Sequence, residues 1–366
     1  MKIPISCPVF GEEEEAALLR TFRTGHWAAG IEVSRLEEEL AASIGAKHAI
    51  AVANGSLALE AALLALGIGR GCEVVTTPLS FFATTEAIIR VGATPVFADV
   101  DPDTYNLAPT SVEEVLTSRT AALLPVHLFG RPCPMDELDA IAARNGLVVL
   151  QDACQAIGAR YQGRYIGANG TSCFSFYGSK NVTCGEGGAV LTNDEAVADR
   201  IRSLRSHGAS KDAYLHESVG TNLRMTDLQA AILRVQLQRL PSITGSRQDN
   251  SRTLSNHLCN ERNIRLPIAD DRIFLSSWHQ YTIRVPRHRR SAIIEEMRRG
   301  GIESRVYYPK LIPTLPAMAS MSPLQRTGCL NHAERAVTEV LSLPVHPRVS
   351  RNDIEYMAGR LSKALL

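Results

Sequence analysis

The 366-residue sequence contains no run of the ~18 apolar residues that a transmembrane helix needs, and no excess of charge of either sign. The first absence predicts that no helix spans a membrane. Lys and Arg number 39 and Asp and Glu number 38, a balance that provides no overall field to hold nucleic acid or an acidic membrane. Apolar residues make up 45% and charged residues 21%, which excludes a mainly disordered chain.

Cysteine is sparse, with eight residues and no C-x-x-C pair. No histidine lies at zinc-finger spacing from a pair of cysteines, so we expect no metal site. The thiols are too few for a disulfide framework, which predicts free thiols and a cytoplasmic location. The N-terminal stretch lacks an apolar core and turns acidic at residues 12–15, so we expect no signal peptide.

Strand-like and helix-like segments alternate over the first two thirds of the chain. The expected strands cover 48–53, 72–78, 94–101, 120–130 and 147–152, and the helices between them cover 56–68, 85–92 and 136–146. This alternation predicts βαβ units and a largely parallel sheet. Ligands bind at the carboxyl ends of the strands in such a sheet, so the residues that follow each strand are candidates for a site.

The pattern changes near residue 226. Residues 226–240 predict a long helix, with Thr226 as its N-cap and Gln229 in the capping-box position. A polar, weakly periodic stretch follows at 244–256.

We therefore place a domain boundary at 245. A large domain is expected over 1–245 and a smaller C-terminal domain over 246–366, with a strand at 278–286 and a helix at 291–302.

Lys180 follows a half-buried strand-like segment, residues 173–177, on a turn bounded by glycines. An amine between an apolar strand and tight turns loses water, and this desolvation lowers its pKa and makes it nucleophilic. An ordinary solvated lysine fits the same pattern, and the segment alone does not decide between the two.

Asp152 closes the strand-like run LVVLQD, at the carboxyl end of an expected parallel strand. An acid in this place either caps the segment that follows or acts as a functional carboxylate. Pyridoxal phosphate needs such a carboxylate beside its pyridinium nitrogen, and Gln155, one helical turn further on, would face the same ligand. Both interpretations of Asp152 stay open at this point.

Residues 54–56 link an expected strand to an expected helix through small side chains. The N–H groups and the dipole of a helix N-terminus favour phosphate, which makes Gly55 and Ser56 a candidate anion site with Ser175 as a further hydroxyl. Simple N-capping by Ser56 is the alternative. Phe81 or its neighbour follows the next strand, where an aromatic face covers a planar cofactor or packs in the core.

The order of these signals is more specific than any one of them, and in it the sequence resembles the DegT/StrS family of sugar aminotransferases. These enzymes depend on pyridoxal phosphate, have fold type I and act on nucleotide-linked keto sugars. The most specific match is FSFYGSKNVTCGEGGAV around Lys180. Further matches between residues 54 and 347 are NGSLALEAAL, SFFATTEAI, PVFADVDPDTYNL, LPVHLFGRPCPMDEL, QDACQAIGA, VGTNLRMTDLQAAI, YYPKL and LSLPVHP.

The resemblance implies a seven-stranded, mostly parallel sheet flanked by helices, with a smaller C-terminal α/β domain. It also implies that Lys180 binds the cofactor covalently and then moves protons. Asp152 would pair with the pyridine nitrogen and Gln155 would lie near the phenolic oxygen.

Other cofactor contacts follow from the same resemblance. Phe81 would stack on the ring, and Gly55, Ser56 and Ser175 would bind the phosphate. Asn222 would reach the phosphate in the neighbouring subunit, which makes a homodimer with shared active sites necessary for a complete site.

Three further residues have weaker support. Tyr308 would contact the sugar, or else pack between domains. Arg224 would bind the carboxylate of the amino donor, or else form a salt bridge at a helix entry. His127 is expected to be a packed residue rather than a catalytic one.

The resemblance thus implies transfer of an amino group from glutamate or glutamine to a keto sugar, foremost a nucleotide-linked keto-deoxyhexose. Two alternatives stay open. One is an aminotransferase for a keto-cyclitol or another ketone without a nucleotide, and the other is a catalytically idle sensor with the same fold.

Overall fold

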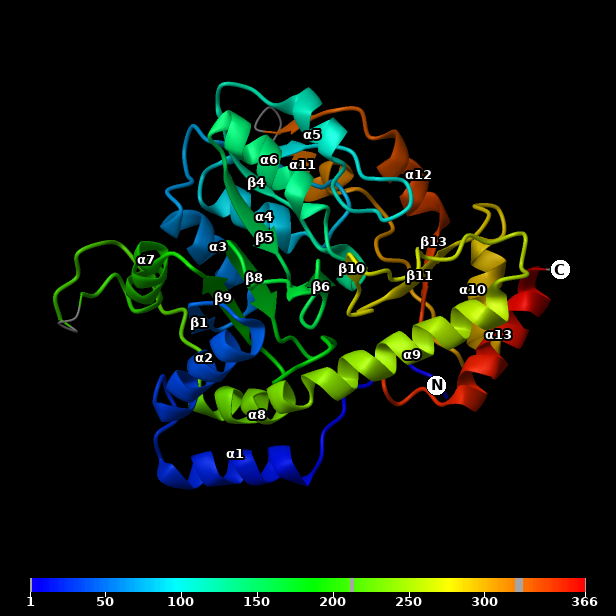
Figure 1. Ribbon diagram of the computed structural model, residues 1–366, viewed down its shortest axis with the longest axis horizontal. Helices are drawn as coiled ribbons and strands as arrows, with labels where there is room; N and C mark the ends of the chain where they lie inside the picture. Colours follow the sequence, from blue (N-terminus) through cyan, green and yellow to red (C-terminus); the bar gives the residue numbers. More distant parts are fainter. Residues whose placement is uncertain (1, 211–213, 320–324, 366) are drawn as a thin grey trace.

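The computed structural model describes residues 2–210, 214–319 and 325–365. Its centre is an eight-stranded sheet in the order β1-β9-β8-β5-β4-β2-β3-β12 (Figure 1). Neighbouring strands from β8 to β12 run parallel, and only β9 is antiparallel to its neighbours, so the predicted mostly parallel sheet is confirmed. The strands are β1 (His48–Val52), β2 (Glu73–Thr76), β3 (Thr94–Phe97), β4 (Thr120–Leu124), β5 (Val148–Asp152), β8 (Thr171–Ser175), β9 (Gly188–Thr192) and β12 (Arg326–Thr327).

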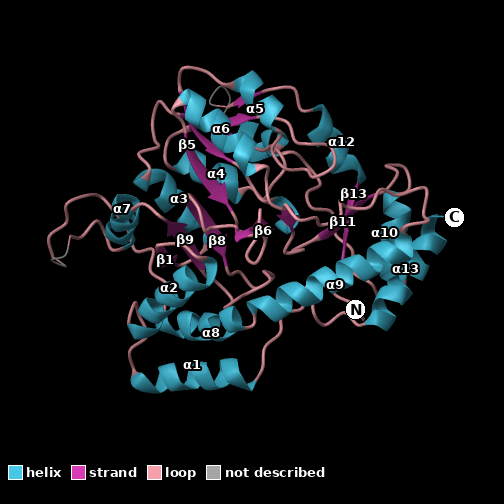
Figure 2. Ribbon diagram, viewed as in Figure 1, coloured by secondary structure: helices cyan, strands magenta, loops and turns pink. Residues whose placement is uncertain are grey.

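Helices cover both faces of this sheet (Figure 2). Along β1, Ala49 and Ala51 pack on the side of α2 and α8, while Ile50 and Val52 pack on the side of α3 and α7. This period of two places apolar residues on both faces of a buried strand. The helices that precede α9 are α1 (Glu12–Thr24), α2 (Ile31–Ile44), α3 (Gly55–Ala65), α4 (Ala83–Arg90), α5 (Pro109–Val115), α6 (Met135–Asn145), α7 (Glu195–Arg205) and α8 (Asp227–Gln238).

The sheet has one strand more than the seven that the family resemblance implies. The additional strand, β12, comes from the last third of the chain and pairs Arg326 with Val96 at the sheet edge. The buried Glu73 carboxylate holds it there, because it accepts hydrogen bonds from Arg326 at 2.8 Å and from Arg119 at 2.6 Å. A two-residue strand held by side chains leaves no periodic signal in the sequence.

The C-terminal elements form a second core. Its antiparallel pair β11 and β13 packs with α10, α13 and the end of α9 around Tyr281, Ile283 and Met357. Ile3, near the N-terminus, packs in the same core and bridges to Ile302. The remaining elements are α9 (Leu240–Leu258), α10 (Arg290–Arg299), α11 (Pro316–Ala319), α12 (Asn331–Glu339), α13 (Arg351–Leu365), β6 (Arg160–Tyr161), β7 (Arg164–Tyr165), β10 (Phe274–Leu275), β11 (Tyr281–Arg284), β13 (Val340–Leu343) and the 3₁₀ turns Leu128–Gly130 and Ile312–Thr314. No described helix combines the length and the apolar character that crossing a membrane requires.

The predicted boundary at 245 lies inside α9, which runs from α8 to the C-terminal elements (Figure 1). The helix expected over 226–240 ends at Gln238, and α9 begins two residues later with a proline in its first turn. The capping box of Thr226 and Gln229 is present as predicted. The division at 245 stays a prediction, and in the structure the chain passes it within a continuous helix.

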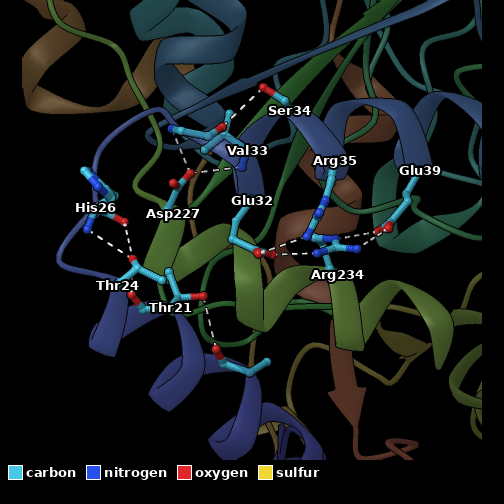
Figure 3. A network of polar contacts seen from close by, with 12 residues as sticks. Thr21, Thr24, His26, Glu32, Val33, Ser34, Arg35, Glu39, Asp227 and Arg234 are labelled. Atoms are coloured by element: carbon cyan, nitrogen blue, oxygen red, sulfur yellow. Dashed lines mark hydrogen bonds and ion pairs between the residues drawn. The ribbon is translucent and has the colours of Figure 1, made fainter.

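Helix α8 fixes α2 through two charged side chains (Figure 3). The buried Asp227 carboxylate accepts hydrogen bonds from the N–H groups of Gly30, at 2.9 Å, and Val33, at 3.0 Å, at the start of α2. Arg234, two turns further along α8, binds Glu32 at 2.6 Å and Glu39 at 2.5 Å. Asp227 thus supplies from another helix the N-terminal cap that α2 lacks in its own sequence.

Replacing Asp227 by Ala is expected to lower the free energy of unfolding by about 2 kcal/mol, because two N–H groups lose a charged acceptor in a buried place. Chemical denaturation measures the change. Ser34→Ala, which removes an exposed hydroxyl from the same turn, serves as the control and should stay close to wild type. Equal stability of the two variants would contradict the capping role.

Candidate active site

The turn that carries Lys180 is fixed by hydrogen bonds between the residue at its start, Phe176, and residues 183 and 187 that follow it. The N–H of the buried Phe176 donates to the Gly187 carbonyl at 2.8 Å, and the Thr183 hydroxyl donates to the Phe176 carbonyl at 2.9 Å. The Lys180 N–H donates to the Tyr177 carbonyl at 2.8 Å. The lysine therefore stands on a tight turn directly beyond β8, where the sequence predicted it.

The Lys180 side chain is half-buried. Burial lowers the pKa of its ammonium group, and the nearby Asp152 carboxylate opposes this shift in part. The amine is thus easier to deprotonate than a solvated lysine, which is what a nucleophile requires. The structure agrees with the desolvated lysine of the sequence analysis rather than with a surface residue.

Asp152 is buried at the end of β5, next to β8. Its Oδ2 accepts a hydrogen bond from the Thr84 hydroxyl at 2.7 Å, and Thr84 is in turn 3.0 Å from the Ser80 hydroxyl. Its Oδ1 accepts from the Cys154 N–H at 3.1 Å. The carboxylate therefore caps the next turn, as one interpretation expected, and is also held in one orientation by α4.

Gln155 links the aromatic side of the site to the backbone. Its Oε1 accepts from the Phe129 N–H at 2.9 Å, so the amide nitrogen must face the other way, where it donates to the Tyr308 hydroxyl at 3.2 Å. The Tyr308 ring lies 6.4 Å from the ring of Phe81, which is 62% exposed. Burial raises the pKa of Tyr308 well above its usual value, so its hydroxyl keeps a proton that it can donate to a ligand.

The start of α3 lies against the end of β8. A Cβ atom at Gly55 would lie 2.7 Å from the Ser175 Cβ and 3.0 Å from the Cys154 sulfur, a separation that only glycine allows. The free N–H groups of α3 and the Ser175 hydroxyl are thereby brought side by side, as an anion site requires.

The cap of α3 differs from the alternative that the sequence left open. Asn54, not Ser56, is the N-cap residue, and its side chain accepts from the Leu57 N–H at 2.9 Å. Ser56 is exposed in the first turn of the helix. Because Asn54 provides the cap, the Ser56 hydroxyl is not needed for that purpose.

Asn222 and Arg224 are not brought to Lys180 by the described part of this chain. Asn222 is exposed, bridges to Ser206 and accepts from the Arg224 N–H at 3.2 Å. Arg224 bridges to Val52 and forms no ion pair with the described residues. The roles expected for both side chains stay predictions.

His127 is a packed residue, as expected. It is fully buried, its Nδ1 accepts from the Cys133 N–H at 2.9 Å, and its Nε2 lies 3.0 Å from the Gln151 Oε1. Burial lowers its pKa to about 4. The imidazole is therefore neutral, with both nitrogens occupied.

The sequence analysis missed residues that act only through tertiary contacts. Thr84 lay just before the helix expected over 85–92 and inside α4 in the structure, and nothing in its spacing indicates the bond to Asp152. His279 lay in an expected strand of the other domain, and in the structure it contacts Asn181, the residue after Lys180. Neither contact leaves a pattern in the nearby sequence. Both can therefore be identified only from the three-dimensional structure.

A lysine and a carboxylate at adjacent ends of a doubly wound α/β sheet, with a glycine helix start beside them, are the features of a pyridoxal-phosphate-dependent transferase of fold type I. The chain belongs to the DegT/DnrJ/EryC1/StrS aminotransferase family, whose model matches residues 8–362. It is therefore an aminotransferase with this cofactor.

Individual relatives extend over nearly the whole chain. It is 41% identical over 342 residues to the dTDP-3-amino-3,4,6-trideoxy-alpha-D-glucose transaminase of Streptomyces venezuelae, covering 93% of this chain and 88% of that protein. It is 40% identical to a pleiotropic regulatory protein of Geobacillus stearothermophilus, covering 93% and 91%. The solved structure of S. venezuelae DesV in complex with a ketimine intermediate aligns with a TM-score of 0.92 and 38% identity over 96% of this chain and 94% of that one.

Replacing Thr84 by Val is expected to weaken cofactor binding about tenfold, because Asp152 loses one of the donors that fix its orientation. Titration of the cofactor-free protein by absorbance measures this change. The neighbouring Thr85 gives a matched control, since it is fully buried and its hydroxyl has no hydrogen-bond partner among the described residues, so Thr85→Val should bind like wild type. Equal cofactor affinity in the two variants would show that Thr84 does not position Asp152.

Proposed function

We propose that this enzyme transfers an amino group from glutamate or glutamine to a nucleotide-linked keto sugar. The observation that carries the proposal is the half-buried Lys180 beside the buried Asp152 carboxylate, in a chain 41% identical to a dTDP-sugar transaminase. A keto-deoxyhexose is the sugar that this similarity favours.

The described residues fit pyridoxal phosphate. Gly55 leaves a space that a Cβ atom would fill, beside the hydroxyl of Ser175, and this cradle with Ser56 suits a phosphate group. Asp152 presents an oriented carboxylate for a pyridinium nitrogen. The exposed ring of Phe81 is available to stack on a planar ring. When bound, the cofactor supplies the electron sink for amino transfer.

Individual side chains would bind the cofactor, transfer protons and stabilise charge. Lys180 would bind the cofactor covalently, and its Nζ, made less basic by burial, would take a proton from the substrate carbon and return it. Asp152 would keep a positive charge on the ring nitrogen. Gln155 would hold Tyr308, whose retained proton is placed to donate to the phenolic oxygen or to the sugar.

The first alternative, a keto-cyclitol aminotransferase, differs from this proposal in its substrate. The second, a catalytically idle sensor, differs in having no turnover. A keto-cyclitol aminotransferase would use the same lysine and carboxylate with a smaller acceptor. A sensor would need the fold and the cofactor but not Lys180, Asp152 and Gln155 together. The presence of all three in one chain, with Asp152 and Gln155 each held by hydrogen bonds, supports catalysis. A cytoplasmic location stays a prediction from the cysteines, all eight of which are free thiols.

The amino form of the cofactor, bound to the purified enzyme, is expected to lose its absorbance when a dTDP- or UDP-linked keto sugar is added. The panel should include a keto-cyclitol and the free nucleotides. Lys180→Ala is the control, since it should bind the cofactor but lose nearly all turnover, on the order of 10⁴-fold or more, because the proton carrier is gone. Turnover of the cyclitol alone would favour the first alternative, and binding without turnover would favour the sensor.

We further propose that the active form is a homodimer with shared sites. Large apolar side chains next to the site are exposed in the single chain, with Phe81 at 62% and Tyr177 at 52%. Val219, 95% exposed, lies three residues before Asn222. A second subunit that covers this surface would receive Asn222 at its cofactor phosphate and Arg224, on the same face of the segment, near the amino donor.

Mixing Lys180→Ala and Asn222→Ala chains, then unfolding and refolding them together, tests this sharing. If one site takes these residues from different chains, half of the dimers are mixed and roughly a quarter of all sites are intact. Activity at limiting cofactor should then exceed the average of the two parents. Activity at or below that average would show that the residues do not come from different chains.

A further inference from the structure

A segment of the C-terminal part of the chain, residues 276–280, packs against Gly130 and Gln155 at the candidate cofactor site. The Ser277 N–H donates to the Gly130 carbonyl at 2.9 Å, and its hydroxyl donates to the Gln155 carbonyl at 3.3 Å. There is no room for a side chain at Gly130, where a Cβ atom would lie 2.5 Å from the Ser277 hydroxyl oxygen and 2.8 Å from the His279 backbone nitrogen. The contact is therefore close and specific.

His279 reaches from this segment to the residue after Lys180. Its Nδ1 lies 3.1 Å from the Oδ1 of the buried Asn181, and the Asn181 amide nitrogen donates to the Ser277 carbonyl at 2.9 Å. A carbonyl only accepts, so the Ser277 contact fixes which way the Asn181 amide points. Its oxygen then faces His279, and Nδ1 must carry the imidazole proton.

The charges around His279 keep the ring neutral. Burial lowers its pKa well below the usual value, and the positive charges of Lys180 and Arg247 lower it further. Arg247 comes from α9 and donates to the Trp278 carbonyl at 2.9 Å, beneath the same segment. A neutral ring adds no second positive charge beside Lys180, so it does not disturb the deprotonation of that amine.

We propose that His279 is a positioning residue for Lys180, which acts by donating its Nδ1 proton to Asn181 and so fixing the lysine turn against the C-terminal domain. The inference rests on the role of Lys180 in the proposed function. The tether acts on geometry and on water exclusion, since Asn181 cannot shift without breaking its bonds to both Ser277 and His279. A site held in this way keeps Lys180 desolvated.

A double-mutant cycle tests the tether. His279→Ala and Asn181→Ala should each lower kcat about tenfold or more, with KM changed by less than about threefold. The reason is that Lys180, the proton carrier, loses its fixed position while substrate binding is kept. The double variant should be no worse than the poorer single variant, because both changes break one connection. Losses that multiply in the double variant, or wild-type kcat in either single variant, would overturn the proposal.

A second readout does not depend on turnover. In the cofactor-free protein, the pH dependence of Lys180 acylation, followed by mass spectrometry, reports the pKa of the amine. Water admitted by His279→Ala should raise this pKa toward the usual value of about 10.4. An unchanged pKa in both alanine variants would overturn the proposal even if the enzyme turned over no sugar at all, which separates this result from failure of the proposed function.

His279→Asn provides the rescue, since its amide keeps a donor near the Nδ1 position and stays neutral. It should retain kcat within about threefold of wild type and an unshifted pKa of Lys180, if positioning is the role. An Asn variant as poor as the Ala variant would assign the role to Nε2 instead. Should His279→Ala fail to fold, Asn181→Ala and His279→Asn still make the comparison. His288→Ala, at an exposed histidine, should match wild type in both readouts.

Discussion

The parallel pairing of β5 with β8, in a register that sets Asp152 beside Cys173, is the contact on which the candidate site depends. It places the carboxylate at one strand end and the start of the Lys180 turn at the next. The same strand end lies against Gly55, so the phosphate cradle shares this edge. A shift of register by one residue would turn every side chain of β8 to the other face and separate the three groups.

The site also requires a buried carboxylate and a half-buried amine that are positioned by different contacts. Asp152 accepts hydrogen bonds from the Thr84 hydroxyl and the Cys154 N–H, so its orientation does not require a salt bridge to Lys180. Lys180, whose pKa burial lowers, is left available for chemistry. Had the two groups paired fully, the amine would be held protonated and would be a poor nucleophile.

Much of this arrangement could be predicted from the sequence, because it follows local periodicity. Most strands and the helices between them lie near the places that alternating and helical patterns indicated, but the strand expected over 120–130 ends at Leu124, and Leu128–Gly130 form a 3₁₀ turn. Lys180, Asp152 and Gln155 follow the strands expected to carry them. The polar stretch at 244–256 was harder, since its buried side presents Thr244, Arg247 and Ser251 at helical spacing. The spacing is regular but the residues are polar, so an apolar pattern could not show the helix.

The features of the site that the sequence did not predict are contacts between segments that lie far apart in the chain. Nothing near His279 in the sequence indicates Asn181, 98 residues away, just as nothing near Thr84 indicates Asp152, 68 residues away. Pairs of this kind depend on which strands become neighbours and on how separate cores pack against each other. They are fixed only when the whole chain has folded.

Helix α9 connects two of these cores. Its first turns place Leu240 and Ile243 in a core beside the main sheet, and its last turns place Leu254 and Leu258 in the C-terminal core. A hinge at 245 would have to break a helix anchored at both ends, so the two cores are expected to move little relative to each other. A helical connection of this kind would keep His279, beside the C-terminal core, within hydrogen-bond distance of the Lys180 turn.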